Sequence, residues 1–189
     1  AAFGRWLLPR LAQHYGDRYA PIDADEYAAR NSRVAPGFIR VDADEVCYDL
    51  HIWLRFELER ALVRGELAVA DLPAAWNQRF EELFGFAPPS DRDGCLQDVH
   101  WSAAYGYFPT YTLGNCYAAQ LMSAIRRELP QLDEQLAAGD FAPLLDWLRR
   151  GVHRHGRRYE PAELCRRATG EALDASHLLR HIEARYDQH

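Results

Sequence analysis

Apolar residues recur at three- and four-residue intervals along most of the chain, which is the spacing of amphipathic helices. The longest such pattern predicts a helix over residues 43–64, with one apolar face of about six turns. Its apolar positions are Val46, Leu50, Trp53, Leu54, Leu58, Ala61 and Leu62. Asp42 and Glu45 are spaced as an aspartate version of a capping box, and Gly65 is expected to end the helix. A second long pattern predicts a helix over 108–129 that stops before Pro130.

Shorter periodic stretches predict further helices, each bounded by a capping residue, a proline or a glycine. They run from Asp71 to Gly85, over 131–138, across "FAPLLDWLRRG", from Pro161 to Gly170, and onward from Asp174. "FAPPSDRDG" is the clearest loop. No alternating pattern of strand length is present, so the expected class is all-α, with about nine helices. A chain of 189 residues predicts a single helical domain over 1–189.

The charge and cysteine content exclude several classes of protein. The net charge is −6 and the arginines are scattered, so no nucleic-acid partner is expected. No apolar run approaches the roughly 18 residues of a membrane helix, so no membrane partner is expected. The four cysteines form no tight pattern with one another or with histidine, which favours free thiols and a cytoplasmic protein over a zinc finger or a disulfide scaffold.

Residues 95–115, "CLQDVHWSAAYGYFPTYTLGN", are unusually rich in rings with polar tips. On a helix, Tyr107 and Tyr111 would project from one face, and the turn "LQDVHW" would place Gln97 and Asp98 where they orient His100. A histidine and a tyrosine that face a substrate can stabilise a developing oxyanion. The alternative is that these rings fill space and direct their polar tips to water or backbone.

Arg40 lies just before the predicted N-terminus of the first long helix, where backbone N–H groups already favour anions. There it could bind a carboxylate through two parallel hydrogen bonds. The alternative is a local ion pair between Arg40 and one of Asp42, Asp44 or Glu45.

"IRVDADE", "GCLQDVHW" and "GYFPTYTLGN" resemble signature motifs of the carboxypeptidase Taq family, in the same order. These proteins are zinc metallocarboxypeptidases with a mostly helical fold shared with neurolysin and angiotensin-converting enzyme, a zincin fold. The resemblance extends to "NSRVAPGFIRVDADEVCYDLHIWLRFELERAL" and "HRHGRRYEPAELCRRATGEAL" and covers essentially the whole chain. It implies an all-α fold of that type and a peptide C-terminus as the substrate.

The resemblance also implies roles for individual residues. Arg40 would bind the terminal carboxylate of the substrate, and His100 with Tyr107 or Tyr111 would polarise the scissile carbonyl. Gln97, Asp98 and Trp101 belong to the same motif as His100 and would support it.

The zinc site of the family is a His-Glu-x-x-His helix with a later glutamate, and that sequence does not occur here. The matched region would therefore be the C-terminal portion of the enzyme, with zinc in the intact enzyme and no metal on this chain alone. His177 and His181 have a chelating spacing but lack a glutamate base, and a pair on a helix surface is expected instead.

One departure from the family pattern concerns residues 102–105, where "SAAY" replaces a glycine-rich segment that is one residue longer. On a continuous helix, a one-residue deletion rotates all later residues by about 100°, which would disturb the geometry between His100 and Tyr111. Asp49 also replaces a residue expected to be proline or asparagine.

Two classes of function remain open from the sequence. The chain is either the C-terminal portion of a metallocarboxypeptidase, active only with its N-terminal portion, or a truncated and inactive helical homologue. The inactive homologue would act as a binding or dimerisation module, since family members are commonly homodimers. Whether this chain is itself an enzyme is left undecided.

Overall fold

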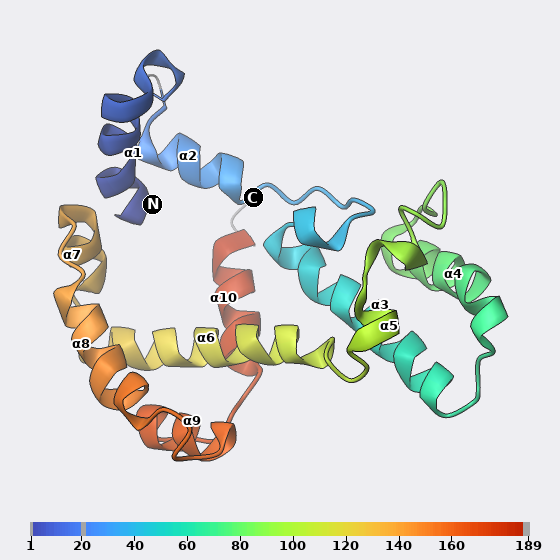
Figure 1. Cartoon of the computed structure of the whole chain (residues 1–189). Helices are drawn as coiled ribbons and strands as arrows, with labels where there is room; N and C mark the ends of the chain where they lie inside the picture. The colour runs from blue at the N-terminus through green and yellow to red at the C-terminus, as the bar shows by residue number, and fades with distance from the viewer. Residues whose placement is uncertain (1, 20–21, 187–189) are drawn as a thin grey trace. The chain divides into compact units, whose positions relative to one another are not determined.

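The computed structural model describes residues 2–19 and 22–186. In this part of the chain all regular structure is helical, with ten α-helices, five short 3₁₀ helices and no strand (Figure 1). The predicted all-α class is confirmed. None of the helices found there is both long and apolar enough to span a membrane.

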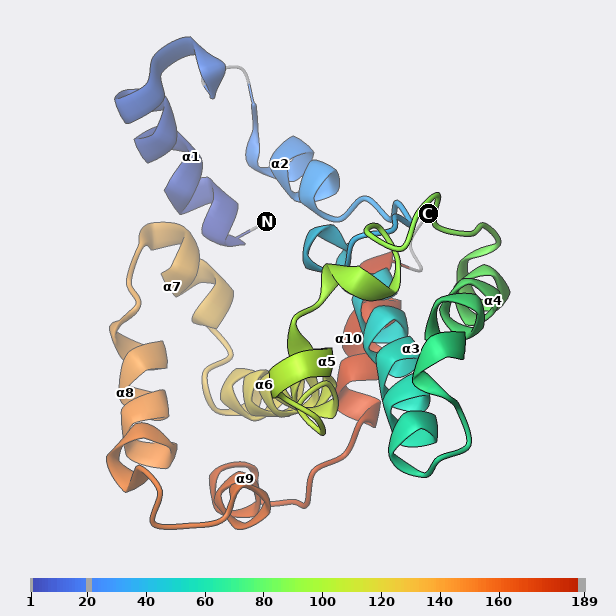
Figure 2. The same cartoon turned by 45° about the vertical axis from the view of Figure 1, so that its right-hand side comes forward.

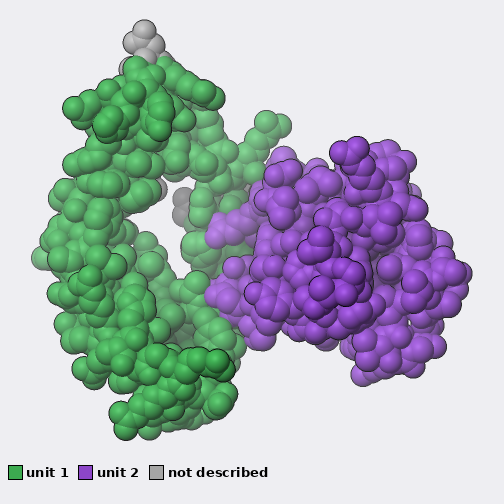
Figure 3. Space-filling view, in the orientation of Figure 1, with its two compact units in different colours: residues 1–33, 116–189 green, residues 34–115 purple. Residues whose placement is uncertain are grey.

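The chain divides into two compact units (Figure 3). Unit 1 comprises residues 1–33 and 116–189, and unit 2 comprises residues 34–115. The boundary falls inside the helix α6, Pro109–Glu128, so one continuous helix belongs to both units. A single domain over 1–189 stays a prediction.

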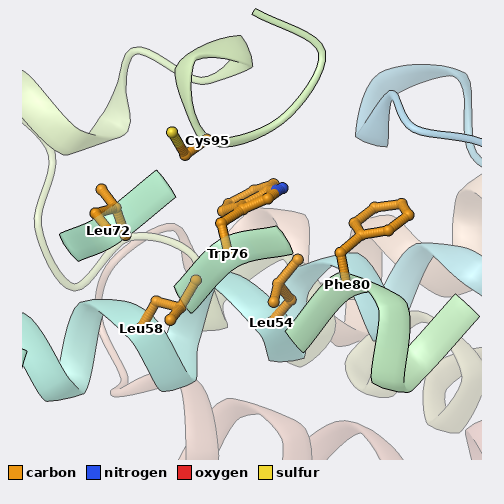
Figure 4. Packing of buried hydrophobic residues seen from close by; sticks show 6 residues of the cluster. All are labelled: Leu54, Leu58, Leu72, Trp76, Phe80 and Cys95. Atoms are coloured by element: carbon orange, nitrogen blue, oxygen red, sulfur yellow. The ribbon is translucent and has the colours of Figure 1, made fainter. Parts of the chain in front are cut away.

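Unit 2 is built on α3 and α4, which follow one another in the chain and lie side by side (Figures 1 and 2). Its elements are η2 Arg40–Asp42, α3 Glu45–Val63, η3 Val69–Asp71, α4 Leu72–Phe84, η4 Cys95–Gln97, α5 His100–Ala103 and the start of α6. Between α3 and α4 lies a compact apolar core (Figure 4). Its buried members are Leu54, Leu58, Leu72, Trp76, Phe80 and Cys95.

The two long helices α3 and α6 lie within two residues of their predicted bounds. The predicted capping box is wrong, because the N-cap of α3 is Asp44 and not Asp42. The Asp44 carboxylate accepts hydrogen bonds from the backbone N–H groups of Val46 and Cys47. Burial opposes ionisation of this carboxyl, but the hydrogen bonds outweigh it and lower the pKa of Asp44. Gly65 follows the helix with φ 73°, as expected of the residue that ends it.

The predicted apolar face of α3 is only partly the buried one. Leu54 and Leu58 are buried, but Leu50 is 37% exposed and Trp53 is 52% exposed. The buried side instead carries polar residues at four-residue intervals, namely His51, Arg55 and Glu59. Because these three side chains face the interior, α3 contributes charge and hydrogen bonds to unit 2 as well as apolar packing.

Unit 1 holds the remaining helices and its own apolar core. Its elements are α1 Ala2–Tyr15, η1 Gly16–Arg18, α2 Ala24–Asn31, the rest of α6, α7 Leu132–Ala138, α8 Ala142–Gly151, η5 His153–His155, α9 Pro161–Thr169 and α10 Ser176–Tyr186. The core contains Ala124, Ile125, Leu132 and Trp147. Gly139, predicted to end α7, does so at φ 80° and lies against the Trp6 ring of α1, where an added Cβ would come within 2.2 Å of the indole nitrogen.

Buried polar groups in unit 1 tie α6 to the C-terminal helices. The Gln120 amide, fully buried in α6, donates to Thr169 and Ala172 and accepts from the backbone N–H of Asp174. His177 is buried and lies 3.1 Å from Glu171, so the expected surface position of this histidine is wrong. All four cysteines are free, as predicted, and all four are buried.

Candidate functional site

The Asp98 carboxylate is shared by two arginines that come from different segments of unit 2. Its Oδ1 accepts hydrogen bonds from Nη2 and Nε of Arg40, at 2.7 and 3.2 Å. Its Oδ2 accepts a hydrogen bond from Nε of Arg55, at 2.5 Å. All three side chains are buried, with exposed fractions of 8% or less. We call Arg40, Asp98 and Arg55 the ionic cluster.

The backbone around Asp98 explains how one carboxylate reaches both arginines. The predicted helical turn over "LQDVHW" is wrong, because η4 ends at Gln97 and α5 begins only at His100. Asp98 lies between them with extended backbone, at φ −114° and ψ 132°. The side chain of this extended residue is buried and reaches the guanidinium groups of Arg40 and Arg55.

Gln97 acts on Arg40 and not on His100. Its Oε1 accepts a hydrogen bond from the backbone N–H of Arg40 at 2.9 Å, and its amide nitrogen donates to the carbonyl oxygens of Phe38, Asp93 and Gly94. The expectation that Gln97 orients the imidazole is therefore wrong. Gln97 instead joins the "IRVDAD" segment to the "QDVHW" segment.

His100 lies between Asp98 and Tyr111. Its Nδ1 is 3.4 Å from Asp98 Oδ1, within ion-pair distance but without hydrogen-bond geometry, and its Nε2 is 3.2 Å from the Tyr111 hydroxyl. Tyr107 stacks on the same imidazole with a centroid distance of 5.7 Å and an interplanar angle of 23°. Asp98 is thus close to His100 without a hydrogen bond to it, and an orienting role of Asp98 stays a prediction.

The two tyrosines do not share a helix, because α6 begins at Pro109 and Tyr107 precedes it. Their rings nevertheless meet edge to face, with centroids 5.4 Å apart. The connector of residues 104–108 is not helical, and Gly106 turns it at φ 80°. The predicted rotation by a shortened helix is therefore wrong, and His100 and Tyr111 remain in contact.

Arg40 does not pair with Asp42, Asp44 or Glu45, so the local ion pair considered as an alternative is not formed within η2 and α3. Its guanidinium carbon lies 4.9 Å from the centre of the Tyr111 ring, and its Nη1 donates to the Tyr48 hydroxyl at 3.1 Å. One group of contacting side chains, all in unit 2, therefore contains Arg40, Asp98, His100, Tyr107 and Tyr111.

The charges in this group shift several pKa values. Burial opposes ionisation of Asp98, yet the pKa of its carboxyl is lowered because Arg40 and Arg55 outweigh the burial. Burial lowers the pKa of Arg55 to about 10, and Asp98 limits that decrease. The pKa of Arg40 is raised, because its bonds to Asp98 and Tyr48 outweigh the effect of burial. All three groups are therefore ionised at neutral pH.

Three residues of α3 in this region were not predicted from the sequence. Arg55 holds Asp98, Tyr48 accepts from Arg40, and Glu59 accepts a hydrogen bond from the backbone N–H of Gly106 at 2.7 Å. The spacing of His51, Arg55 and Glu59 places these three on one side of α3. The helix carries other charged residues too, such as Asp49 and Glu57, so this spacing alone does not mark that side as buried.

Two further residues of the motifs have structural contacts. Trp101, which was predicted to support His100, packs against Trp76 and donates to the Cys95 carbonyl at 2.6 Å. Asp49 is accommodated at its unexpected position, because it accepts hydrogen bonds from Thr112 and Asn115.

His51 is fully buried next to the ionic cluster. Its ring lies against Phe84 at a centroid distance of 4.7 Å, and its Nε2 has no hydrogen-bond partner. Burial, followed by the nearby charge of Arg55, lowers the pKa of the imidazole to about 4. His51 is therefore neutral in the folded chain at neutral pH.

This histidine predicts an acid-sensitive stability. Between about pH 6.5 and 4 the unfolded chain protonates His51 and the folded chain does not, so the free energy of unfolding falls as the pH falls. The loss over that window amounts to about 3 kcal/mol. Urea unfolding of the wild type and of His51→Leu at pH 7 and pH 4.5 measures it. His51→Leu should lose less stability on acidification than the wild type, whereas the exposed His153→Gln should behave as the wild type. Equal losses in wild type and His51→Leu would contradict the assignment.

Metal-binding residues were not expected on this chain. In residues 2–19 and 22–186, no three His, Cys, Asp or Glu side chains come together in a group that could hold a metal ion. The described residues therefore do not fit a metal site of their own.

Comparisons with known proteins identify the family. The model of the carboxypeptidase Taq (M32) metallopeptidase family matches residues 1–186. The chain is 46% identical over 188 residues to thermostable carboxypeptidase 1 of Thermus thermophilus and 41% identical over 170 residues to carboxypeptidase 1 of Bacillus subtilis. It spans 98% and 89% of its own length in these matches, but only 37% and 34% of the length of the two relatives.

Solved structures give the same result. Metallocarboxypeptidase 1 of Trypanosoma cruzi superposes with a TM-score of 0.93 at 42% identity, over 99% of this chain and 39% of that one. The M32 carboxypeptidase of Deinococcus radiodurans superposes with a TM-score of 0.94 at 41% identity, over 99% of this chain and 38% of that one. The chain therefore belongs to the carboxypeptidase Taq (M32) family of metallopeptidases.

Proposed function

We propose that this chain acts as the C-terminal portion of a zinc-dependent carboxypeptidase that removes C-terminal amino acids from peptides. In this proposal, unit 2 supplies the residues that bind the substrate carboxylate and polarise the scissile carbonyl. The observation that carries the proposal is the contact between two distant motifs. Arg40 of "IRVDAD" and Asp98 of "QDVHW", 58 residues apart in sequence, form one buried ion pair in a chain of this family.

Arg40 is assigned to the terminal carboxylate of the peptide. A guanidinium has five N–H donors, and three of those of Arg40 bond to Asp98 and Tyr48. One N–H on each terminal nitrogen remains, and these two donors can bind a carboxylate end-on. Because Asp98 and Tyr48 hold the guanidinium, little side-chain entropy is lost when the substrate binds.

His100 and Tyr111 are assigned to the scissile carbonyl. With its ring proton on Nε2, the tautomer that this proposal requires, His100 donates a hydrogen bond to the Tyr111 hydroxyl oxygen in the absence of substrate. The carbonyl oxygen of the substrate becomes negative in the transition state. It would then accept hydrogen bonds from the imidazole and the hydroxyl, which would stabilise the transition state more than the ground state. Tyr107, half exposed and stacked on His100, would cover the imidazole and serve as a further donor.

The metal of the reaction would activate water and polarise the carbonyl when bound. Since the described residues do not fit a metal site, we propose that the zinc ligands and the general base belong to a part of the working enzyme outside the described residues. This chain's contribution is then to hold the substrate carboxylate and carbonyl in place.

A chimera tests this assignment. The chain replaces the matching 37% of the Thermus thermophilus relative, and release of the C-terminal residue from a blocked dipeptide is measured. We expect turnover in the chimera and a loss of about 10²–10³-fold in kcat on His100→Ala, because one donor to the developing oxyanion is removed.

The matched control is His153→Ala, which removes an exposed histidine of unit 1 and should leave kcat unchanged. A chimera with the helical content of its parent but no turnover, or an active chimera that is indifferent to His100→Ala, would refute the proposal.

A second candidate function is a non-catalytic module that binds another protein or a second copy of itself. The exposed Leu50, Trp53 and Val63 side chains of α3 favour it, because large apolar groups in contact with water are often covered by a partner. The chimera assay separates the two functions, since a binding module would give a folded chimera without turnover.

A further inference from the structure

Arg55 is a buried cation that the proposed function does not use. Its side chain has no exposed surface, and its guanidinium carbon lies 4.7 Å from the centre of the Trp76 ring and 5.9 Å from that of Phe108. Its Nε donates to Asp98 Oδ2, and its Nη1 donates to the His51 carbonyl oxygen at 2.8 Å. Its Nη2 is buried without a hydrogen-bond partner. Such a group is costly to bury, so its presence calls for a reason beyond packing.

The charges of the ionic cluster do not cancel. Two guanidinium groups share one carboxylate, which leaves one net positive charge. Glu59, one turn beyond Arg55 on α3, forms no ion pair with either guanidinium in the described part of the chain, and its carboxylate accepts a hydrogen bond from the backbone N–H of Gly106. In the described part of the chain, Asp98 is the one carboxylate that is hydrogen-bonded to either guanidinium.

We propose that Arg55 determines the preference of this site for a free carboxylate, by sharing Asp98 and so leaving the charge of Arg40 only partly neutralised. Without Arg55, Arg40 and Asp98 would form a neutral pair with little attraction for an anion. With Arg55, the cluster keeps a positive charge in a region where low polarity strengthens its effect. Arg55 acts through Asp98 and does not touch the substrate, so it is a specificity-determining residue and not a catalytic one.

This inference rests on the proposed function, in which the cluster binds the C-terminus of a peptide. It also explains the choice of arginine at position 55. A guanidinium is more weakly hydrated than an ammonium and stacks on aromatic rings, so it can remain charged between Trp76 and Phe108.

A matched pair of small probes tests it on the 189-residue chain. N-acetyl-L-alanine carries the free carboxylate, and N-acetyl-L-alaninamide has the same shape without the charge. Binding of each is followed by NMR through the Nε–H signal of Arg40, which donates to Asp98 and therefore reports on the cluster itself. The variants are Arg55→Met and Arg55→Gln, which remove the charge, and Arg55→Lys, which keeps it.

We expect the wild type to bind the acid about tenfold or more tightly than the amide. Arg55→Met and Arg55→Gln should bind the two probes about equally, while Arg55→Lys, whose more strongly hydrated ammonium is less favourable between the two rings, should keep only part of the preference. A folded Arg55→Met or Arg55→Gln chain, verified by circular dichroism, that retains the wild-type preference would overturn the inference and leave the proposed function standing. A wild type that binds acid and amide equally would overturn both.

Discussion

Replacing Asp98 with asparagine is expected to lower the free energy of unfolding of this chain by about 3–5 kcal/mol. Asparagine has nearly the same shape as aspartate and can still accept hydrogen bonds, so the cost comes from charge. Arg40 and Arg55 would lose the carboxylate that they share, and two buried guanidinium groups would face each other without a counter-ion. Urea unfolding, followed by the intrinsic tryptophan fluorescence to which the buried Trp76 contributes, measures the change at pH 7.

The control for this substitution is Asp91→Asn in the loop after α4. Asp91 is exposed, so its change should stay within about 0.5 kcal/mol of the wild type. If Asp98→Asn costs no more than Asp91→Asn, the ionic cluster does not stabilise unit 2 in the way described.

The stability contributed by Asp98 also depends on pH. Because the pKa of Asp98 is lowered in the folded chain, its charge contributes stability above the pKa of the unfolded carboxyl. That contribution is lost as the pH falls through the lower, folded value. The His51 effect occurs in a separate and higher window, between about pH 6.5 and 4, so the two groups can be told apart in one titration.

The helices of this chain could be predicted well because their signals are local. A long apolar pattern bounded by a cap and a glycine predicted the extent of α3 to within two residues, and a pattern bounded by Pro130 did the same for α6. The detail that failed was the choice of cap. Asp42 and Asp44 are both acidic and two residues apart, and only the backbone conformation shows that Asp44 accepts the first free N–H groups.

The buried side of α3 could not be predicted from hydrophobicity. Polar residues normally lie on the solvent side of a helix, so His51, Arg55 and Glu59 appeared to belong to the exposed face. They are buried because partners far away in sequence satisfy them, such as Asp98 for Arg55 and Gly106 for Glu59. A pattern within one helix contains no information about those partners.

The sequence predicted which residues belong to the candidate site, but not which of them contact one another. The resemblance named Arg40, Gln97, Asp98, His100, Tyr107 and Tyr111, and the structure brings all six into one region of unit 2. The contacts differ because Asp98 has extended backbone and separates η4 from α5. That break directs Asp98 to both arginines and Gln97 to the backbone of Arg40.

The central claim is that Arg40 binds the free carboxylate of a peptide substrate. Its most direct test is the kcat/KM of the Thermus thermophilus chimera for a blocked dipeptide relative to the same dipeptide amide, before and after Arg40→Gln. Loss of a charge-assisted, two-bond contact with the carboxylate should lower the preference for the acid by about 10²–10³-fold. Arg92→Gln, which changes an exposed arginine of the loop after α4, should leave the preference unchanged. An Arg40→Gln chimera that still turns over the dipeptide and retains the full preference would contradict the claim.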